Sequence, residues 1–390
     1  MITTGFSYVA VLLFLAGALV SLEKTSNPIL GKLFCYLPAI ALCYLLPMVL
    51  CSYGVWDLDA TQPVYDALAS SLTYALVFTM LLRCDLRRII KLGPTILVTF
   101  FSASITICIG FVAAFVLMQP YIGSEAWKAL GALCGSWMGG TGNMIAIQTA
   151  LNISEVDMGY ALIIDSVNYT VWVIFLLSVM PMAETFNRWT KANPRFLNKT
   201  AKRLSAEKQV PVRTISSHSL LFLVGTSLLA SVICQKLGVL FHETIPQIDT
   251  STWTILLISA AALLCASSPL GQVAGSTELS SIFLYCVITL MASRVNLSQL
   301  IQVRYWILTG FLVLLIHALL MVVICKLLRL DLFTAGTASL ANIGGSASAP
   351  ILASSYDNTF IPIATMMALM GYAIGTPGGI LTANIMKLFT

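Results

Sequence analysis

A glycine-rich interruption in an apolar segment limits what this chain can fold into. The segment 127–150 is apolar enough to enter a lipid bilayer, yet Gly139, Gly140 and Gly142 stand within four positions at its centre. A glycine in a helix interior costs about 1 kcal/mol relative to alanine. Non-helical backbone persists at membrane depth only where protein buries it or where it lines a cavity. The sequence therefore predicts a deliberately broken membrane helix.

The same interruption occurs again in the second half of the chain. Gly344 and Gly345 lie 205 positions after Gly139 and Gly140. Two interrupted apolar segments at matching places in two halves of a chain indicate the binding site of a transporter. We therefore interpret the chain as a secondary transporter.

Composition supports a membrane protein with all-α architecture. The 390 residues are 58% hydrophobic and 9% charged, whereas a soluble domain has about 25% charged residues. Most of the net charge of +5 sits in the polar stretch 184–217, so the charge indicates topology rather than nucleic acid binding. The ten cysteines form no CxxC pair, and we expect no disulfide or metal framework.

Twelve apolar segments follow one another along the chain. They are 6–22, 33–51, 64–82, 94–118, 127–150, 159–180, 220–234, 253–266, 282–292, 305–327, 334–355 and 360–388. If the two broken segments enter and return on one side as hairpins, the basic loops share the cytoplasmic side, in agreement with the positive-inside rule. We therefore favour ten crossings and two re-entrant hairpins. The alternative is that the broken helices cross and one other segment does not.

The hairpin arrangement turns the two halves into inverted repeats. A further match supports duplication, because the stretch 83–90 aligns with 294–301 at an offset of 211. We expect a first inverted repeat over 1–183, a basic cytoplasmic linker over 184–217 and a second inverted repeat over 218–390.

Asp165 is the leading candidate for ion coupling. It lies deep in the segment that follows the first break, and Asn168 is three positions later on the same helical face. A charged side chain at the membrane centre costs about 3 kcal/mol by insertion scales and therefore faces a partner or a cavity. The alternative is a structural aspartate bonded to backbone amides that the break frees.

Neutral polar groups gather around both breaks. Carbonyls of an unwound segment coordinate sodium, while the amino ends of half-helices favour an anion. We assign ion coupling to the backbone of Gly139, Gly140, Gly344 and Gly345, with sodium as the only metal expected. The predicted substrate-binding residues are Ser136, Thr141, Asn143, Gln148, Asn342, Ser346 and Ser348. Small polar residues also serve in ordinary helix packing, which is the alternative for each one singly.

His317 and the stretch 375–379 each allow more than one interpretation. His317 lies in the middle of an apolar segment and titrates near neutrality when unperturbed, but a lone histidine is more often a hydrogen-bonding contact between helices. The stretch 375–379 contains three glycines and a proline. It predicts a break in the last helix, as a hinge or a kink.

The centres 139–143 and 342–346, with the helices after them, resemble the YjcL-like family of uncharacterised bacterial membrane proteins. That family groups with the superfamily of cation:proton antiporters and anion transporters, which includes bile acid sodium symporters and citrate or glutamate sodium symporters. The resemblance covers nearly the whole chain. It implies a scaffold domain, a mobile core domain of the elevator type, a homodimer and a multi-pass location in the inner (plasma) membrane. Asp165 resembles the position of the essential carboxylates in sodium/proton antiporters, although Ser166 follows it where a paired acid would stand.

Three functions compete at this point. The first is symport of a small organic, anionic solute with Na⁺ or H⁺, by alternating access. The second is cation/proton antiport that uses Asp165. The third, an intramembrane enzyme, is disfavoured because no HExxH, GxSxG or paired aspartate motif lies in a membrane segment. We expect no cofactor beyond the coupling ion, and a small-molecule solute and membrane lipid as partners, without nucleic acid.

Overall fold

The apolar segments of the sequence form helices. The computed structural model describes residues 1–25, 34, 39–192, 214–246, 248–295, 303–356 and 360–390, with side chains omitted at 86, 88, 346, 347 and 354–356. Among these residues the only β pairing is an isolated bridge between Ile2 and Trp56. Seven described helices are long and apolar enough to span a membrane, and three shorter apolar helices accompany them. The all-α, multi-pass membrane class is therefore confirmed.

The helices of the first half begin and end close to the predicted segments. They are α1 (Gly5–Glu23), α3 (Ala39–Ser52), α4 (Leu58–Leu81), α5 (Leu86–Ile90), α6 (Pro94–Ile122), α7 (Trp127–Gly139), α8 (Thr141–Ala150), α9 (Glu155–Val179) and α10 (Ala183–Thr190). Polar side chains accept from the first turn of three of them: Thr4 for α1, Asp57 for α4 and Ser154 for α9. These caps satisfy amides that have no partner within the helix.

The second half repeats the layout. Its helices are α12 (Ser217–Thr244), α13 (Thr250–Ala266), α14 (Ser276–Ala292), α15 (Val303–Leu328), α16 (Leu332–Ile343), α17 (Gly345–Tyr356) and α18 (Ile361–Lys387). Most of the predicted linker (193–213) and most of the second repeated stretch (296–301) lie outside the described residues. The match between 83–90 and 294–301 is therefore not tested.

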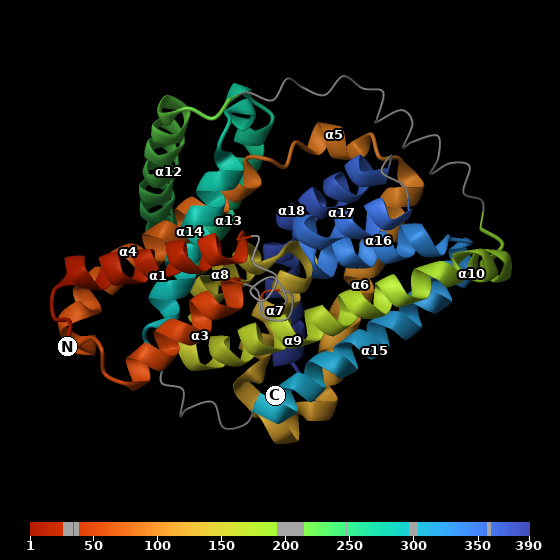
Figure 1. Ribbon diagram of the computed structural model, residues 1–390, viewed down its shortest axis with the longest axis horizontal. Coiled ribbons are helices and arrows are strands. Elements are labelled where there is room, and N and C mark those ends of the chain that lie inside the picture. The colour runs from red at the N-terminus through yellow and green to blue at the C-terminus, as the bar shows by residue number, and fades with distance from the viewer. Residues whose placement is uncertain (26–33, 35–38, 193–213, 247, 296–302, 357–359) are drawn as a thin grey trace.

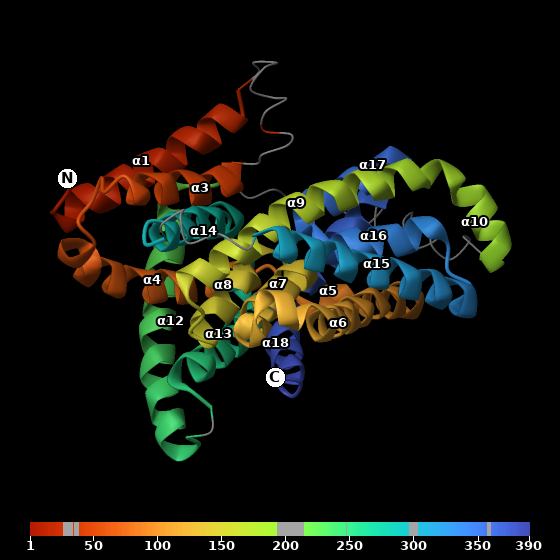
Figure 2. The same ribbon diagram turned by 90° about the horizontal axis from the view of Figure 1, so that it is seen from below.

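The helices pack as two groups, which Figures 1 and 2 show side by side. The first group contains α1, α3, α4, α12, α13 and α14, and the second contains α6, α7, α8, α9, α15, α16, α17 and α18. Helix α8 makes the main contact between them, because it packs against both α4 and α13. In Figure 2, α12 projects beyond its neighbours, and most of its exposed side chains are apolar, as a lipid-facing helix requires.

Both broken segments fold back on themselves as hairpins. A methyl group added at Gly135 would overlap Ile147, although a continuous helix would separate positions twelve apart by about 18 Å. In the second broken segment, a methyl group added at Gly336 would lie 3.4 Å from Leu352. Helices α7 and α8 therefore form one hairpin, here called hairpin 1, and α16 and α17 form hairpin 2.

The loops gather at two ends of the molecule. At the Trp56 end, the Trp56 indole donates to the Ser293 carbonyl (2.9 Å), and Arg294 donates to the Leu58 carbonyl (2.7 Å). At the opposite end, here called the Trp189 end, Lys326 donates to the carbonyl of Trp189. The basic start of the linker thus lies at the end opposite to the acidic start of α4.

The last helix is not interrupted at 375–379, so the predicted break was wrong, whereas a kink there is not tested. Helix α18 runs without interruption from Ile361 to Lys387, with Pro377 inside it. Its glycines instead allow close packing on α7: a methyl group at Gly135 would lie 3.1 Å from the Gly375 carbonyl, and one at Gly139 would overlap the Gly371 carbonyl. The glycines are four positions apart on each helix, so they lie in one row along its face. Such rows of small residues let two membrane helices approach each other closely.

Candidate functional site

The two breaks use their glycine pairs in the same way. Gly140 has φ +88° between α7 and α8, and Gly345 has φ +57° at the start of α17, a backbone region that favours glycine. The preceding glycine is crowded in each case. A methyl group at Gly139 would overlap the Gly371 carbonyl, and one at Gly344 would overlap the Ser348 hydroxyl. The second glycine of each pair therefore makes the turn, and the first allows close packing.

Asp165 is held against the end of α7. Its Oδ1 accepts from the indole Nε1 of Trp137 (2.9 Å), and its Oδ2 accepts from the hydroxyl of Ser136 (3.2 Å). Both donors belong to the last turn before the first break. Among the described residues, no lysine or arginine forms an ion pair with Asp165. The partly buried carboxylate is therefore satisfied by neutral donors of hairpin 1.

Hairpin 2 reaches the same helix one turn further on. A methyl group at Gly344 would lie 2.7 Å from the ring of Tyr169, which is four residues after Asp165 on α9. Ser348 is 2% exposed, and its hydroxyl has no hydrogen-bond partner of normal geometry among the described residues. The turns of both hairpins thus converge on the stretch of α9 from Asp165 to Tyr169.

The two predicted asparagines hold the hairpins in place. Asn143 donates to the Gly139 carbonyl (2.7 Å) and accepts from the amide (3.1 Å) and hydroxyl (2.7 Å) of Thr376 on α18. Asn342 donates to the Ala338 carbonyl (2.8 Å) and accepts from the Ser104 hydroxyl (2.7 Å) on α6. Both side chains are fully buried. Their amides are occupied by contacts that fix each break against a neighbouring helix.

The other predicted residues occupy separate places. Asn168 turns toward α15, where its Nδ2 donates to the Ile307 carbonyl (3.3 Å) and its buried Oδ1 has no partner. Thr141 is partly exposed at the turn of hairpin 1. Gln148 lies two turns further along α8, in a polar cavity next to α4. The side chain of Ser346 lies outside the described part of the structure.

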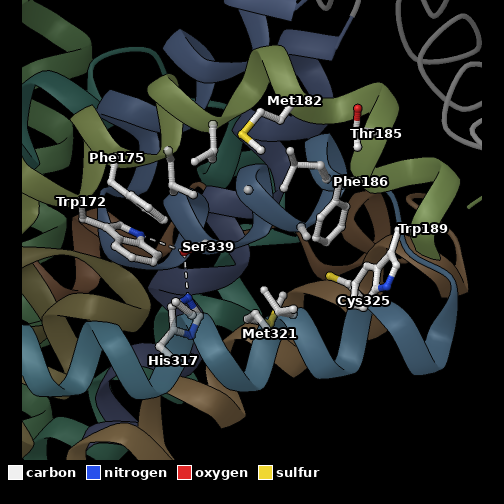
Figure 3. A pocket seen from close by; sticks show the side chains of 17 residues that line it. Trp172, Phe175, Met182, Thr185, Phe186, Trp189, His317, Met321, Cys325 and Ser339 are labelled. Carbon is white, nitrogen blue, oxygen red and sulfur yellow. Dashed lines mark hydrogen bonds between the residues drawn. The ribbon is translucent and has the colours of Figure 1, made fainter.

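His317 is part of a hydrogen-bonded chain rather than a free titrating group. Its Nδ1 pairs with the Thr106 hydroxyl and its Nε2 with the Ser339 hydroxyl, both at 2.8 Å. The Trp172 indole also donates to Ser339 (3.0 Å), as Figure 3 shows. The chain closes one end of an apolar cavity of about 380 Å³ that α9, α10, α15 and α16 line. The interpretation of His317 as a helix contact therefore agrees with the structure.

Sequence reasoning missed Trp137 and Ser339. A tryptophan in an apolar segment is most often a packing residue, and the ring of Trp137 does stack edge-on against Phe111 (centroids 5.2 Å apart). Its donor role depends on the approach of α9, which local sequence does not encode. The available signal was the position of Trp137 two residues before the glycine pair.

These features define a multi-pass α-helical membrane protein with two glycine-broken hairpins that meet on a carboxylate-bearing helix. The chain belongs to the family described as "Protein of unknown function (DUF819)", whose model matches residues 10–389. No curated protein matches it.

Proposed function

We propose that this protein is a secondary active transporter that moves a small organic, anionic solute, coupled to Na⁺ or H⁺, by alternating access. One observation carries the proposal: Asp165 lies where the turns of both hairpins converge, bonded to Ser136 and Trp137 before the first break and one turn from Tyr169 beside the second. A carboxylate among apolar helices is expensive to keep, and such residues mark ion or proton pathways in membrane proteins.

The hairpin turns supply the complementary chemistry. The carboxyl ends of α7 and α16 bring helix carbonyls to the breaks, and the amino ends of α8 and α17 bring backbone amides. Such carbonyls attract a cation, and such amides attract an anionic group. Among the described residues, no group of three or more histidine, cysteine, aspartate or glutamate side chains could hold a metal ion. A coupling sodium ion would therefore use neutral oxygens together with Asp165.

The architecture supports alternating access. We assign the first group of helices as the scaffold and the second group, which holds both hairpins, as the mobile core. The repeated order of helices supports inverted repeats over 1–183 and 218–390 with the linker 184–217 in the cytoplasm. These features fit the superfamily that the YjcL-like resemblance implies. With that superfamily we also propose a homodimer in the inner membrane, and we propose no enzymatic activity.

Cation/proton antiport is the second candidate, and Asp165 favours it. Its carboxylate accepts hydrogen bonds from neutral donors only, so protonation and cation binding compete for the same oxygens. The chain lacks the paired acid at Ser166 that the antiporters of the superfamily carry.

Flux through purified protein in liposomes tests both candidates. Symport predicts that a sodium or proton gradient drives accumulation of a labelled solute, whereas antiport predicts cation-driven proton movement without solute. A panel of small organic anions, first ranked by thermal shift with and without sodium, supplies the solutes. If no gradient drives either movement for any member of the panel, the transporter assignment is wrong.

A further inference from the structure

A polar cavity of about 290 Å³ lies between the two groups of helices. Helix α4 contributes one wall, and α8 with the loop that follows it contributes the opposite wall. The groups are tied together beside it, where Thr252 of α13 donates to the Ala150 carbonyl (2.8 Å) and Tyr44 of α3 donates to the Glu155 carbonyl (2.8 Å). The cavity therefore sits at the junction that alternating access would open and close.

The lining is rich in acceptors and carries negative charge. Its polar side chains include Asp66, Ser70, Gln148, Asn152, Glu155 and Ser251, and no described lysine, arginine or histidine lines it. One oxygen of Asp66 accepts from Gln62 (2.7 Å), and one oxygen of Glu155 accepts from Tyr65. Neither carboxylate has an ion-pair partner among the described residues.

The side chain of Arg294 contacts Tyr65 of the cavity lining, but it donates its hydrogen bond to a residue outside that lining. The guanidinium of Arg294 lies 4.7 Å from the centre of the Tyr65 ring and donates to the Leu58 carbonyl. It stacks on Tyr8 as well, at 5.4 Å. Arg294 thus contacts the tyrosine that lines the cavity, and among the described residues it forms no ion pair with Asp66 or Glu155.

Gln148, which lines this cavity, has a side-chain oxygen that lacks a donor among the described residues. Its side chain is 3% exposed, and its Oε1 is buried without a hydrogen-bond partner. A buried acceptor that finds no donor destabilises the fold, and native proteins keep few of them. Gln148 stands on α8, so a ligand that donates to it would contact hairpin 1 directly.

We propose that this cavity binds the ammonium group of a small amine-bearing solute. An ammonium offers three donors and no acceptor, which matches two carboxylates and an amide oxygen that lacks a donor. The cavity is much larger than a bare sodium ion and has room for the body of the solute. The proposal rests on the proposed function in one respect, because the bound molecule is taken to be a transported solute, which would then carry an ammonium beside its anionic group.

Binding of butylammonium chloride to the full-length protein in lipid nanodiscs tests the site, with sodium butyrate as the probe of opposite charge and sodium held constant. We expect the protein to bind butylammonium, and any butyrate binding, such as at the hairpin amides, should not depend on Asp66, Gln148 or Glu155. Glu155→Gln and Asp66→Asn keep the hydrogen bonds to Tyr65 and Gln62 but lose the charge, so each should weaken binding about tenfold. Glu125→Gln is the matched control, because Glu125 is exposed, does not line the cavity and pairs with Lys128 (2.8 Å).

Gln148→Met provides a variant that leaves both charges in place. It removes the acceptor at nearly constant volume and should also weaken butylammonium binding. The melting temperature of each variant without ligand identifies any variant that fails to fold. The variants that fold then test the amine site. The proposal is overturned if the wild-type protein does not bind butylammonium, if the three site variants weaken butyrate binding as much as butylammonium binding, or if they bind butylammonium like the control.

Flux in liposomes separates this proposal from the proposed function. Ion-driven solute flux without butylammonium binding would leave the transporter assignment intact and reject the amine site. Butylammonium binding that depends on Glu155, in a protein that moves no solute or ion under any gradient, would support the site and reject transport.

Discussion

At the scale of single residues, Asp165 is the group on which ion coupling should depend. Asp165→Asn preserves the shape of the side chain and an acceptor for Trp137, but it removes the charge. We expect ion-driven flux to be abolished while folded protein remains in the membrane. Flux in liposomes beside the melting temperature in detergent measures both effects.

Asp57→Asn is the matched control for that substitution. Asp57 caps α4 through a bond to the Ala60 amide (3.0 Å), and asparagine is an equally good cap. Flux should therefore persist in Asp57→Asn. Unchanged flux with unchanged ion dependence in Asp165→Asn would make Asp165 a structural residue and remove the main support for antiport.

The glycine turns are a second prediction at the residue scale. Gly140 and Gly345 have positive φ, and a non-glycine residue in such a region costs about 1–3 kcal/mol. Around Gly345 no described residue would contact an added methyl group, and around Gly140 the contact with Tyr372 is ordinary at 3.6 Å. Gly140→Val and Gly345→Val should therefore distort the turns more than they crowd the core, and both should impair solute binding more than yield.

Solute affinity in detergent, measured beside melting, tests the two turns together. Gly17→Val is the control, because a methyl group at Gly17 of α1 would have open space around it. Normal affinity in both turn variants would mean that the breaks are packing devices and that the site lies elsewhere.

At the scale of elements, the breaks could be predicted and their partners could not. Glycine pairs inside apolar segments are a local signal, so the bounds of hairpin 1 match the predicted segment 127–150. The long-range contacts depend on tertiary packing: Asn143 looks like a ligand in the sequence, yet it bonds to Thr376 some 233 positions away. The break predicted at 375–379 was wrong because tight packing on α7 holds α18 as one helix.

The row of small residues between α7 and α18 gives a prediction at this scale. Gly135 approaches the Gly375 carbonyl too closely for a large side chain, and overpacking of a core costs about 1–3 kcal/mol. Gly135→Leu should therefore lower the melting temperature and the yield of folded protein. Gly225→Leu in α12 should not, because nothing lies near Gly225. Equal melting temperatures for the two variants would contradict close packing of α7 on α18.

At the scale of the whole molecule, the arrangement of loops predicts the orientation in the membrane. Asp59 lies at the start of α4, at the Trp56 end, and Lys191 follows α10 at the Trp189 end. Basic residues concentrate on the cytoplasmic side of membrane proteins, and the linker 184–217, which contains Lys191, carries most of the excess charge of this chain. The Trp189 end should therefore face the cytoplasm.

Cysteine labelling in sealed vesicles of known orientation tests this orientation. In a background without the ten native cysteines, Asp59→Cys should react with an impermeant maleimide from the outside and Lys191→Cys only after permeabilisation. Ten spanning helices and two hairpins place these positions on opposite faces. If both cysteines react from the same face of intact vesicles, one of the intervening helices does not cross, and the inverted relation of the two halves is lost. If they react from opposite faces but with the order reversed, the hairpins keep their inverted relation and hairpin 2 then enters from the outside.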